Sequence, residues 1–224
     1  GIGGAKLVDE LKFNPDRYHL NEAHGISAAF YLYQKFNKDA NEVKKRLVFT
    51  THTPEEAGNE KHDIFLCEKM SYFCGLSLQE ARALTGTEDD LFNHSLAALR
   101  LAHIANGVSR LHGQVSKALW SKYKGICPII YITNAQNWRY WADKQMYAKL
   151  EESDDFWLDD RKAFLKKRSF ELVADQTGRL FDPKLFTIVW ARRFAGYKRA
   201  DLITRDKNRF HELLNNTKYP VQII

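Results

Sequence analysis

The chain has 224 residues, of which 44% are hydrophobic and 28% are charged, a composition typical of a globular protein that excludes a disordered one. No apolar run approaches the roughly 18 residues that a membrane helix needs, so no membrane partner is expected. The net charge of +6 raises nucleic-acid binding as a hypothesis. However, the basic run 166–168 shares a predicted helix with several aspartates, which indicates a solvated face, and we expect no nucleic-acid partner.

The predicted elements alternate between helices and short buried strands. In chain order, the patterns predict a helix over 24–36, a strand over 46–50, a loop over 51–63, a helix over 64–75, a helix from a capping box at 77–80 to Gly86, a long helix over 89–122, a strand over 128–133, a helix over 141–174, a strand over 185–190, a helix over 197–215 and a strand from Val221. Strands separated by long helices imply parallel βαβ units. The predicted fold class is therefore α/β with Rossmann-like lobes.

The cysteines and the chain ends place further bounds on the protein. Cys67, Cys74 and Cys127 fit neither a disulfide framework nor a zinc pattern, and their odd number suits a reducing compartment, so we expect a cytoplasmic protein without a metal site. The chain begins with Gly-Ile-Gly-Gly rather than Met and stops inside an apolar run at Ile224. Both features favour an internal piece of a longer protein.

In parallel sheets, ligands bind outside the carboxyl ends of the strands, so the loops 51–54, 134–137 and 191–194 are candidate sites. The segment 192–199, Arg-Arg-Phe-Ala-Gly-Tyr-Lys-Arg, leaves a predicted strand and enters a predicted helix. A guanidinium at the strand end and a lysine in the first helical turn can converge on a bound anion, aided by the helix N-terminus. A basic helix start with no ligand is the alternative. The helix dipole disfavours cations there, which supports the phosphate site.

Histidines supply the other candidate chemistry. His52 follows the strand that ends at residue 50, where a neutral imidazole can donate to a sugar hydroxyl or carry protons, although it could equally be structural. The run 19–24, His-Leu-Asn-Glu-Ala-His, places two imidazoles and a carboxylate in one short turn before a helix, and a helix cap is its alternative reading. These histidines and the doublet His62-Asp63 also match the ligand types of His-Asp metal-dependent phosphohydrolases. Those enzymes are all-helical, so the strand-like runs argue against them.

Five segments together resemble the glycogen/α-glucan (maltodextrin) phosphorylase family of pyridoxal-phosphate-dependent glycosyltransferases. They are 19–24, 49–54 (Phe-Thr-Thr-His-Thr-Pro), 106–112 (Asn-Gly-Val-Ser-Arg-Leu-His), 132–134 (Ile-Thr-Asn) and 191–200 (Ala-Arg-Arg-Phe-Ala-Gly-Tyr-Lys-Arg-Ala). The resemblance implies the two-lobed GT-B fold. Residues 1–133 would then be the later part of the N-terminal lobe, and 134–224 the incomplete start of the cofactor-side lobe.

The resemblance also implies an activity and its residues. The family transfers a terminal α-1,4-linked glucosyl unit to inorganic phosphate, giving glucose 1-phosphate, and the cofactor phosphate shuttles the proton. Arg193 and Lys198 match residues that hold the substrate and cofactor phosphates. His52 matches a residue near the glucosyl 6-hydroxyl that donates through ring and backbone. Asn134 matches a sugar ligand, and Glu22 and His24 match residues flanking the sugar.

The resemblance has departures and alternatives. Ala135 replaces a glycine of the family pattern, Glu55-Glu56 replaces small or proline residues, and Asn59 stands where many relatives have histidine. The family's Schiff-base lysine is expected beyond residue 224, so the fragment is expected to bind no pyridoxal phosphate and to be inactive, whereas the full-length protein would carry the cofactor and form a homodimer. A non-catalytic carbohydrate-binding lobe and a sugar-nucleotide-dependent glycogen synthase are the alternatives.

Overall fold

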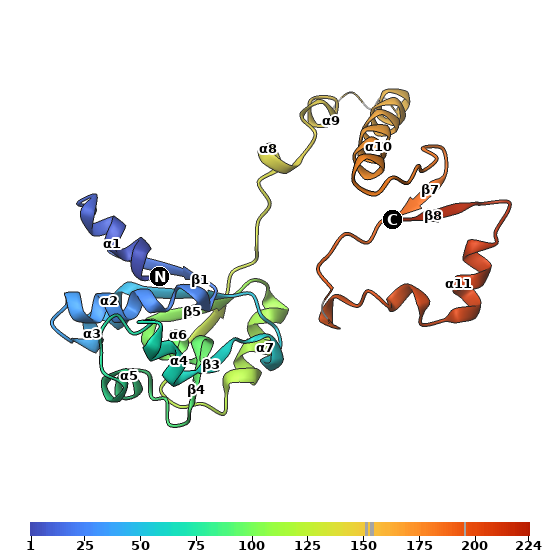
Figure 1. Cartoon of the computed structure of the whole chain (residues 1–224). Helices are drawn as coiled ribbons and strands as arrows, with labels where there is room; N and C mark the ends of the chain where they lie inside the picture. The colour runs from blue at the N-terminus through green and yellow to red at the C-terminus, as the bar shows by residue number, and fades with distance from the viewer. Residues whose placement is uncertain (151, 153–154, 195) are drawn as a thin grey trace. The chain divides into compact units, whose positions relative to one another are not determined.

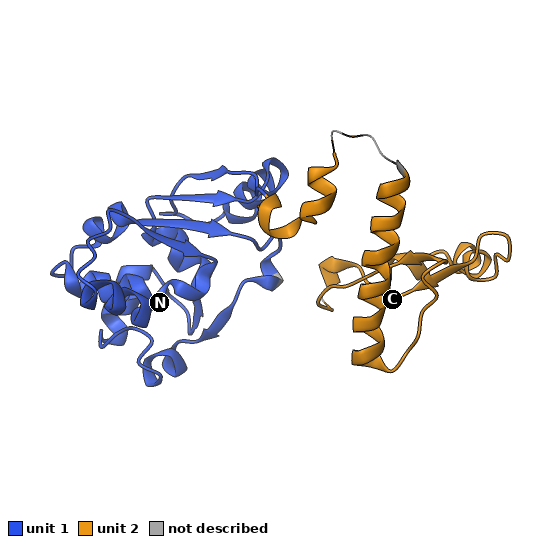
Figure 2. Cartoon of the chain, turned by 90° about the horizontal axis from the view of Figure 1, so that it is seen from above, with its two compact units in different colours: residues 1–135 blue, residues 136–224 orange. Residues whose placement is uncertain are grey.

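The computed structural model describes residues 1–150, 152, 155–194 and 196–224, and the chain divides into two compact units, Gly1–Ala135 and Gln136–Ile224 (Figure 2). This division falls two residues after the boundary that the sequence predicts between 133 and 134. The assignment of the units to the lobes of a larger enzyme stays a prediction.

Unit 1 is built on a four-stranded sheet of order β1-β2-β5-β6 in which every neighbouring pair is parallel (Figure 1). A two-stranded antiparallel hairpin, β3-β4, accompanies it. The elements of unit 1 are α1 (Ile2–Glu10), β1 (Tyr18–Asn21), α2 (Ser27–Lys35), α3 (Ala40–Arg46), β2 (Leu47–Thr51), β3 (Lys61–Asp63), α4 (Ile64–Lys69), α5 (Leu78–Thr85), β4 (Leu91–Asn93), α6 (His94–Leu101), β5 (Ile104–Gly107), α7 (Arg110–Trp120) and β6 (Ile129–Tyr131), with 3-10 turns at Ala23–Gly25 and Glu56–Gly58. The α/β prediction with a parallel sheet is confirmed.

The core of unit 1 lies between this sheet and the helices packed on it. Phe49 in β2 and Leu99 in α6 are almost completely buried, and α6 contacts β2 while α7 contacts β5 and β6. Phe30 of α2 meets Phe73 edge to face at a centroid distance of 5.1 Å. Because each fully buried side chain of this size contributes roughly 1.5–3 kcal/mol, the core fixes the sheet and with it the positions of the strand ends.

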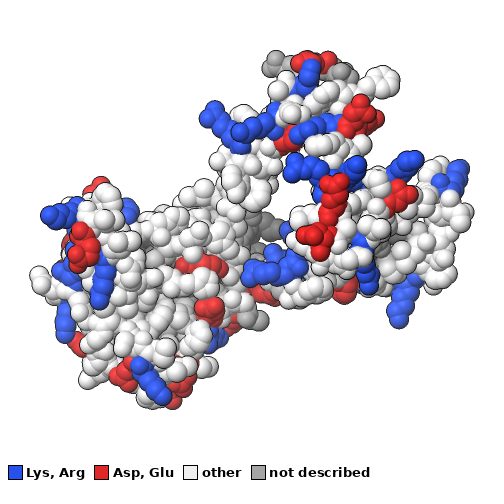
Figure 3. All heavy atoms as spheres, turned by 45° about the horizontal axis from the view of Figure 1, so that its top comes forward, with Lys and Arg blue, Asp and Glu red and all other residues white. Residues whose placement is uncertain are grey.

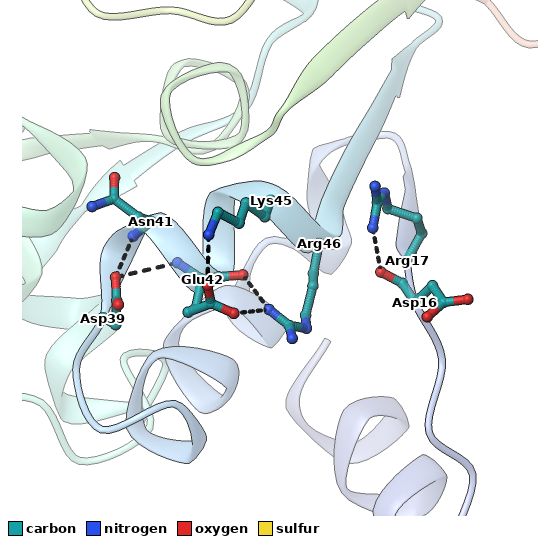
Figure 4. A network of polar contacts seen from close by, with 7 residues as sticks. All are labelled: Asp16, Arg17, Asp39, Asn41, Glu42, Lys45 and Arg46. Carbon is teal, nitrogen blue, oxygen red and sulfur yellow. Dashed lines mark hydrogen bonds and ion pairs between the residues drawn. The ribbon is translucent and has the colours of Figure 1, made fainter.

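Side-chain caps fix where individual helices begin. Asp39 accepts hydrogen bonds from the backbone amides of Asn41 and Glu42 at the start of α3, and Glu42 pairs with Lys45 at 2.8 Å and with Arg46 (Figure 4). These ion pairs hold the pKa of Glu42 down to about 2. The predicted capping box of α5 is confirmed, with Ser77 and Glu80 bonded to each other's backbone amides.

The predicted long helix over 89–122 is wrong. The structure divides this segment into β4, α6, β5 and α7. Ala102 takes an extended ψ of 153° and ends α6, after which β5 pairs with β2 on one side and β6 on the other. A helix-like spacing of apolar residues is also compatible with a buried strand between two helices. Pairing across the sheet therefore determines that residues 104–107 form a strand.

Other boundaries also differ from the predictions. Residues 18–21 form strand β1 instead of the expected turn, and α4 ends at Lys69, well before residue 75. Ser71 and Cys74 adopt positive φ values of 56° and 55°, which no helix can accommodate. Helices α1 and α3 were not predicted.

Unit 2 contains a two-stranded parallel pair, β7-β8, and several helices. Its elements are α8 (Trp138–Trp141), α9 (Lys144–Ala148), α10 (Asp155–Thr177), β7 (Phe186–Ile188), α11 (Lys207–Leu214) and β8 (Val221–Ile223), with 3-10 turns at Gly196–Lys198 and Leu202–Thr204. The helix expected over 141–174 is therefore two short helices and one long one, and residues 151, 153 and 154 lie outside the described part. The helix expected over 197–215 begins only at Lys207, because Arg199 adopts a φ of 54° and Asp206 caps α11.

Across the described residues, no helix combines the length and apolar character required to cross a bilayer. On the face that Figure 3 shows, lysine and arginine side chains are interspersed with aspartate and glutamate side chains.

Candidate functional site

The carboxyl ends of the four parallel strands meet at one edge of the unit 1 sheet. Glu22 follows β1, His52 follows β2 and Val108 follows β5. Beyond β6 the parallel pairing continues, since the amides of Ile132 and Asn134 donate to the carbonyls of Gly107 and Val108, each at 3.0 Å. The sheet therefore brings Glu22, His52 and Asn134 to the edge where ligands of parallel sheets bind.

Glu22 and His52 are joined directly. The His52 backbone N–H donates to Glu22 Oε1 at 3.0 Å, and the Thr53 hydroxyl donates to Glu22 Oε2 at 2.6 Å. His52 Nε2 lies 2.6 Å from Asn21 Oδ1. Because the amide oxygen accepts, Nε2 carries a proton, which leaves Nδ1 of the exposed ring as the nitrogen that can accept a hydrogen bond.

This arrangement corrects part of the expectation for His52. Its backbone N–H, expected to donate to a sugar, is engaged by Glu22 instead. The ring remains exposed at the sheet edge with one nitrogen able to accept a hydrogen bond.

Three hydrogen-bonded polar side chains, of which Thr50 is buried and His19 exposed, cross the strands next to this edge. Thr50, which is 7% exposed, donates from Oγ1 to Asn106 Oδ1 at 2.8 Å, and His19 Nε2 lies 2.7 Å from the same hydroxyl. A hydroxyl has one proton to give, so His19 must donate to Thr50. The three residues tie β1, β2 and β5 together through side chains as well as backbone.

Glu22 itself has a strained backbone. Its φ of 67° lies in the left-handed region, which costs a non-glycine residue of order 1–3 kcal/mol. The two hydrogen bonds that its carboxylate accepts and the bond from its own amide to the Thr50 carbonyl at 2.9 Å hold it there. Strain of this kind is concentrated at functional sites.

The turn between β5 and α7 approaches the sheet closely. A Cβ at Gly107 would lie 2.9 Å from the amide nitrogen of Gly113, so only glycine fits. Ser109 caps α7 by accepting from the His112 amide, and His112 Nδ1 accepts from the Val108 amide at 3.1 Å. This packing explains the glycines of the segment 106–113 and sets the position of Val108 beside Asn134.

The remaining predicted residues lie elsewhere. His24 does not join His52 and Glu22 in a shared set of hydrogen bonds; its Nδ1 lies 3.2 Å from Glu60 Oε2, just before β3. Arg193 and Lys198 belong to unit 2, where Arg193 is exposed and the Lys198 ammonium lies 4.6 Å from the centroid of the Tyr197 ring. The expected helix N-terminus behind them is replaced by a single 3-10 turn.

The sequence reasoning missed several residues. Asn21 and Thr53 bind the two central residues, and each is adjacent in sequence to one of them, so pairing β1 with β2 would have found both. Glu60 and His94 join His62 in a separate cluster that requires the unpredicted hairpin β3-β4. Asp63 caps α4 through the Leu66 amide, so the His-Asp doublet does not act as a pair of ligands.

The sequence has relatives among known proteins. None of the protein-family models matches the chain. It is 39% identical over 221 residues to an uncharacterized protein of Methanocaldococcus jannaschii, covering 99% of this chain and 41% of that protein. It is 31% identical over 271 residues to the maltodextrin phosphorylase of Thermococcus litoralis and 28% identical over 279 residues to the glycogen phosphorylase of Aquifex aeolicus.

All of this chain aligns with each of these two phosphorylases, but it spans only 32% and 40% of their lengths. Both alignments are longer than the 224 residues of the chain, so the phosphorylases carry insertions relative to it, whereas the M. jannaschii alignment does not exceed the chain. The chain is thus related along its whole length to a region of proteins named as phosphorylases.

Proposed function

We propose that this chain is part of an α-glucan phosphorylase and forms the glucosyl side of its site together with part of the phosphate side. One observation carries the proposal. Glu22 and His52, which the resemblance assigns to the sugar site, are 30 residues apart in sequence and yet hydrogen-bonded at the carboxyl edge of a parallel sheet. The full-length similarity to proteins named maltodextrin and glycogen phosphorylase supports the same assignment.

In the proposed reaction, inorganic phosphate replaces the glucan chain on the anomeric carbon of the terminal glucosyl unit. The bond from that carbon to the glycosidic oxygen breaks, a bond to a phosphate oxygen forms, and the departing oxygen takes up a proton. The exposed His52 ring, which follows β2, would accept a hydrogen bond from a sugar hydroxyl. Asn134, which follows β6, would bind the same sugar. Glu22 would act as a positioning residue for His52.

Arg193 and Lys198 would supply the positive charge. A guanidinium and an ammonium are the donors that phosphates prefer, and both side chains are accessible in unit 2. They fit the phosphates of substrate and of pyridoxal phosphate, which the resemblance implies for the whole protein. When bound, that cofactor supplies a phosphate able to give and take a proton. The two cations would bring like-charged groups together and stabilise charge that develops during transfer.

The test assays the whole protein with maltodextrin and inorganic phosphate and measures glucose 1-phosphate. Lys198→Ala should lower kcat by at least about 100-fold, the usual effect of removing one donor to developing charge. Lys218→Ala is the matched control, because its ammonium also lies over the ring of a neighbouring tyrosine, at 5.2 Å, and it should retain wild-type activity. Near-normal turnover by Lys198→Ala would overturn the assignment of the phosphate site.

A non-catalytic carbohydrate-binding protein is the second candidate. The named phosphorylases carry insertions relative to this chain, whereas the uncharacterized protein aligns with it without such insertions, and this difference favours the second candidate. The same assay separates the two functions. Maltodextrin binding by the whole protein without glucose 1-phosphate, at saturating phosphate and cofactor, would establish the binding function and exclude the phosphorylase.

A further inference from the structure

A second polar cluster lies on the hairpin β3-β4 of unit 1. Glu60 precedes β3, His62 is the central residue of β3, and His94 follows β4 as the first residue of α6. The antiparallel register pairs His62 with Phe92, and the His94 amide donates to the Glu60 carbonyl at 3.2 Å. Backbone pairing therefore holds the three side chains together, with one ligand-type atom from each within 4.8 Å of the others.

The cluster lines a cavity of about 260 Å³. His24, Cys67 and Tyr72 also line this cavity. Glu60 and His62 are exposed, whereas His94 is only 4% exposed. The cavity therefore reaches solvent on one side and a buried imidazole on the other, which gives a small ion a path to all three side chains.

The imidazoles of His62 and His94 face each other. His62 Nδ1 lies 2.8 Å from His94 Nε2, and His94 Nδ1 lies 2.8 Å from the Tyr72 hydroxyl. If His94 donates from Nδ1 to Tyr72, its Nε2 presents a lone pair toward His62. A metal-binding histidine usually donates from its other ring nitrogen to a carboxylate, a backbone carbonyl or water, and the Tyr72 hydroxyl takes that place for His94.

The spacing fits a tetrahedral ion after a small movement. With metal–nitrogen distances of about 2.0–2.1 Å, two ligands of a tetrahedron lie about 3.3 Å apart. The two nitrogens would have to separate by roughly half an ångström, which rotation of the exposed His62 ring can provide. Glu60 would add the negative charge, and its carboxylate is held by His24 Nδ1 at 3.2 Å.

The ligand types favour one class of ion. Two imidazoles and one carboxylate form a donor set that binds zinc with one position left open. Calcium and magnesium, which require oxygen ligands, are disfavoured.

We propose that Glu60, His62 and His94 bind one divalent transition-metal ion of the zinc type, with solvent in the fourth position. Tyr72 and His24 act as positioning residues for His94 and Glu60. The ion would stabilise the packing of the hairpin against the first residue of α6. None of the three ligands belongs to the proposed sugar and phosphate sites, although His24, which the resemblance places beside the sugar, contacts Glu60.

The experiment uses the 224-residue chain stripped of metal with a chelator and then titrated with Zn²⁺ by calorimetry and with Co²⁺ by visible spectroscopy. The wild type should bind one equivalent, show the intense visible bands of tetrahedral Co²⁺, and gain thermal stability with added Zn²⁺. His62→Ala and Glu60→Gln, both at exposed positions, should lose stoichiometric binding while melting as the metal-free wild type does.

Two further variants make the result specific. His103→Ala removes another exposed histidine of unit 1 and should bind as the wild type does. Tyr72→Phe keeps the ring and removes the hydroxyl, and it should weaken binding about 10–100-fold, as loss of an outer partner does. The proposal is overturned if the wild type takes up neither ion saturably, or if either His62→Ala or Glu60→Gln binds with wild-type affinity.

Discussion

The His52 backbone amide donates to the Glu22 carboxylate across a distance of 3.0 Å, joining the residues that follow two neighbouring strands. The same carboxylate accepts from the Thr53 hydroxyl, so a single side chain orders the start of the loop after β2. Glu22 adopts a left-handed backbone to reach both donors. The relationship defines the candidate sugar site more sharply than either residue does alone.

Replacement of Glu22 by alanine should therefore destabilise unit 1. Two donors would lose their acceptor, and the left-handed φ would remain unfavourable for the new residue, so we expect a loss of about 1–3 kcal/mol in the free energy of unfolding. Urea denaturation followed by circular dichroism measures the change. Glu55→Ala, at an exposed position of the same loop, is the control. Equal stability of the two variants would show that the carboxylate does not order the loop.

Asp9 links α1 to α2 in a pH-dependent manner. Its carboxylate accepts from Lys35 at 2.5 Å and from the Tyr31 hydroxyl at 2.7 Å, and these bonds lower the pKa of Asp9 below its ordinary 3.8 while the pKa of Tyr31 rises to about 12. Because the folded pKa of Asp9 is depressed, its contribution is present above pH 3.8 and is lost as the pH falls through the folded value.

Asp9→Asn should thus be less stable than the wild type at pH 7, by about 1 kcal/mol for the weakened hydrogen bonds, and the difference should shrink as the pH drops below 3.8. Unfolding free energies measured between pH 7 and pH 2 give this difference. Glu10→Gln, on the same helix and exposed, should show no such loss at pH 7. A difference that is independent of pH would argue against the titration of Asp9 as its cause.

The cysteines should differ in reactivity. Cys127 is 3% exposed, and burial raises the pKa of its thiol to about 11, so only about one molecule in a thousand carries the thiolate at pH 8. Cys74 is half-buried and should react first with iodoacetamide in the native protein. Peptide mass spectrometry after timed labelling gives the order, and denaturant should make the cysteines equivalent. Labelling of native Cys127 at the rate of Cys74 would contradict the buried position.

Gly107 should tolerate no side chain. An alanine Cβ would meet the Gly113 amide nitrogen at 2.9 Å and the His112 carbonyl carbon at 3.0 Å, so Gly107→Ala should destabilise by about 1–3 kcal/mol. Gly4→Ala is the opposite case, since no heavy atom lies within 4 Å of the place that its methyl group would take in helix α1, and it should stabilise by up to about 1 kcal/mol. Thermal melting of both variants tests the pair. An unchanged melting temperature for Gly107→Ala would mean that β5 and α7 can move apart without loss of stability.

Local sequence signals predicted much of the fold where they were strong. The capping box at Ser77 and Glu80 set the start of α5, and the apolar runs of β2, β6 and β7 gave strands within one or two residues of the observed ones. They failed at β5 (Ile104–Gly107), because apolar residues recur at helix-like steps before and after it, even though Asn106 and Gly107 interrupt them. Pairing with β2 and β6 makes this segment a strand, and that pairing involves residues distant in sequence.

The candidate sites show the same division. Residue identity and order define the motifs around Glu22 and His52 and the similarity to phosphorylases. The sequence by itself therefore determined the fold class and the candidate site residues. Only the tertiary structure decided their partners. Parallel strand pairing joined Glu22 to His52. His24 contacts Glu60 instead, and the antiparallel hairpin brings Glu60, His62 and His94 together. Contacts of this kind depend on which strands pair, and the pairing joins segments that are distant in sequence.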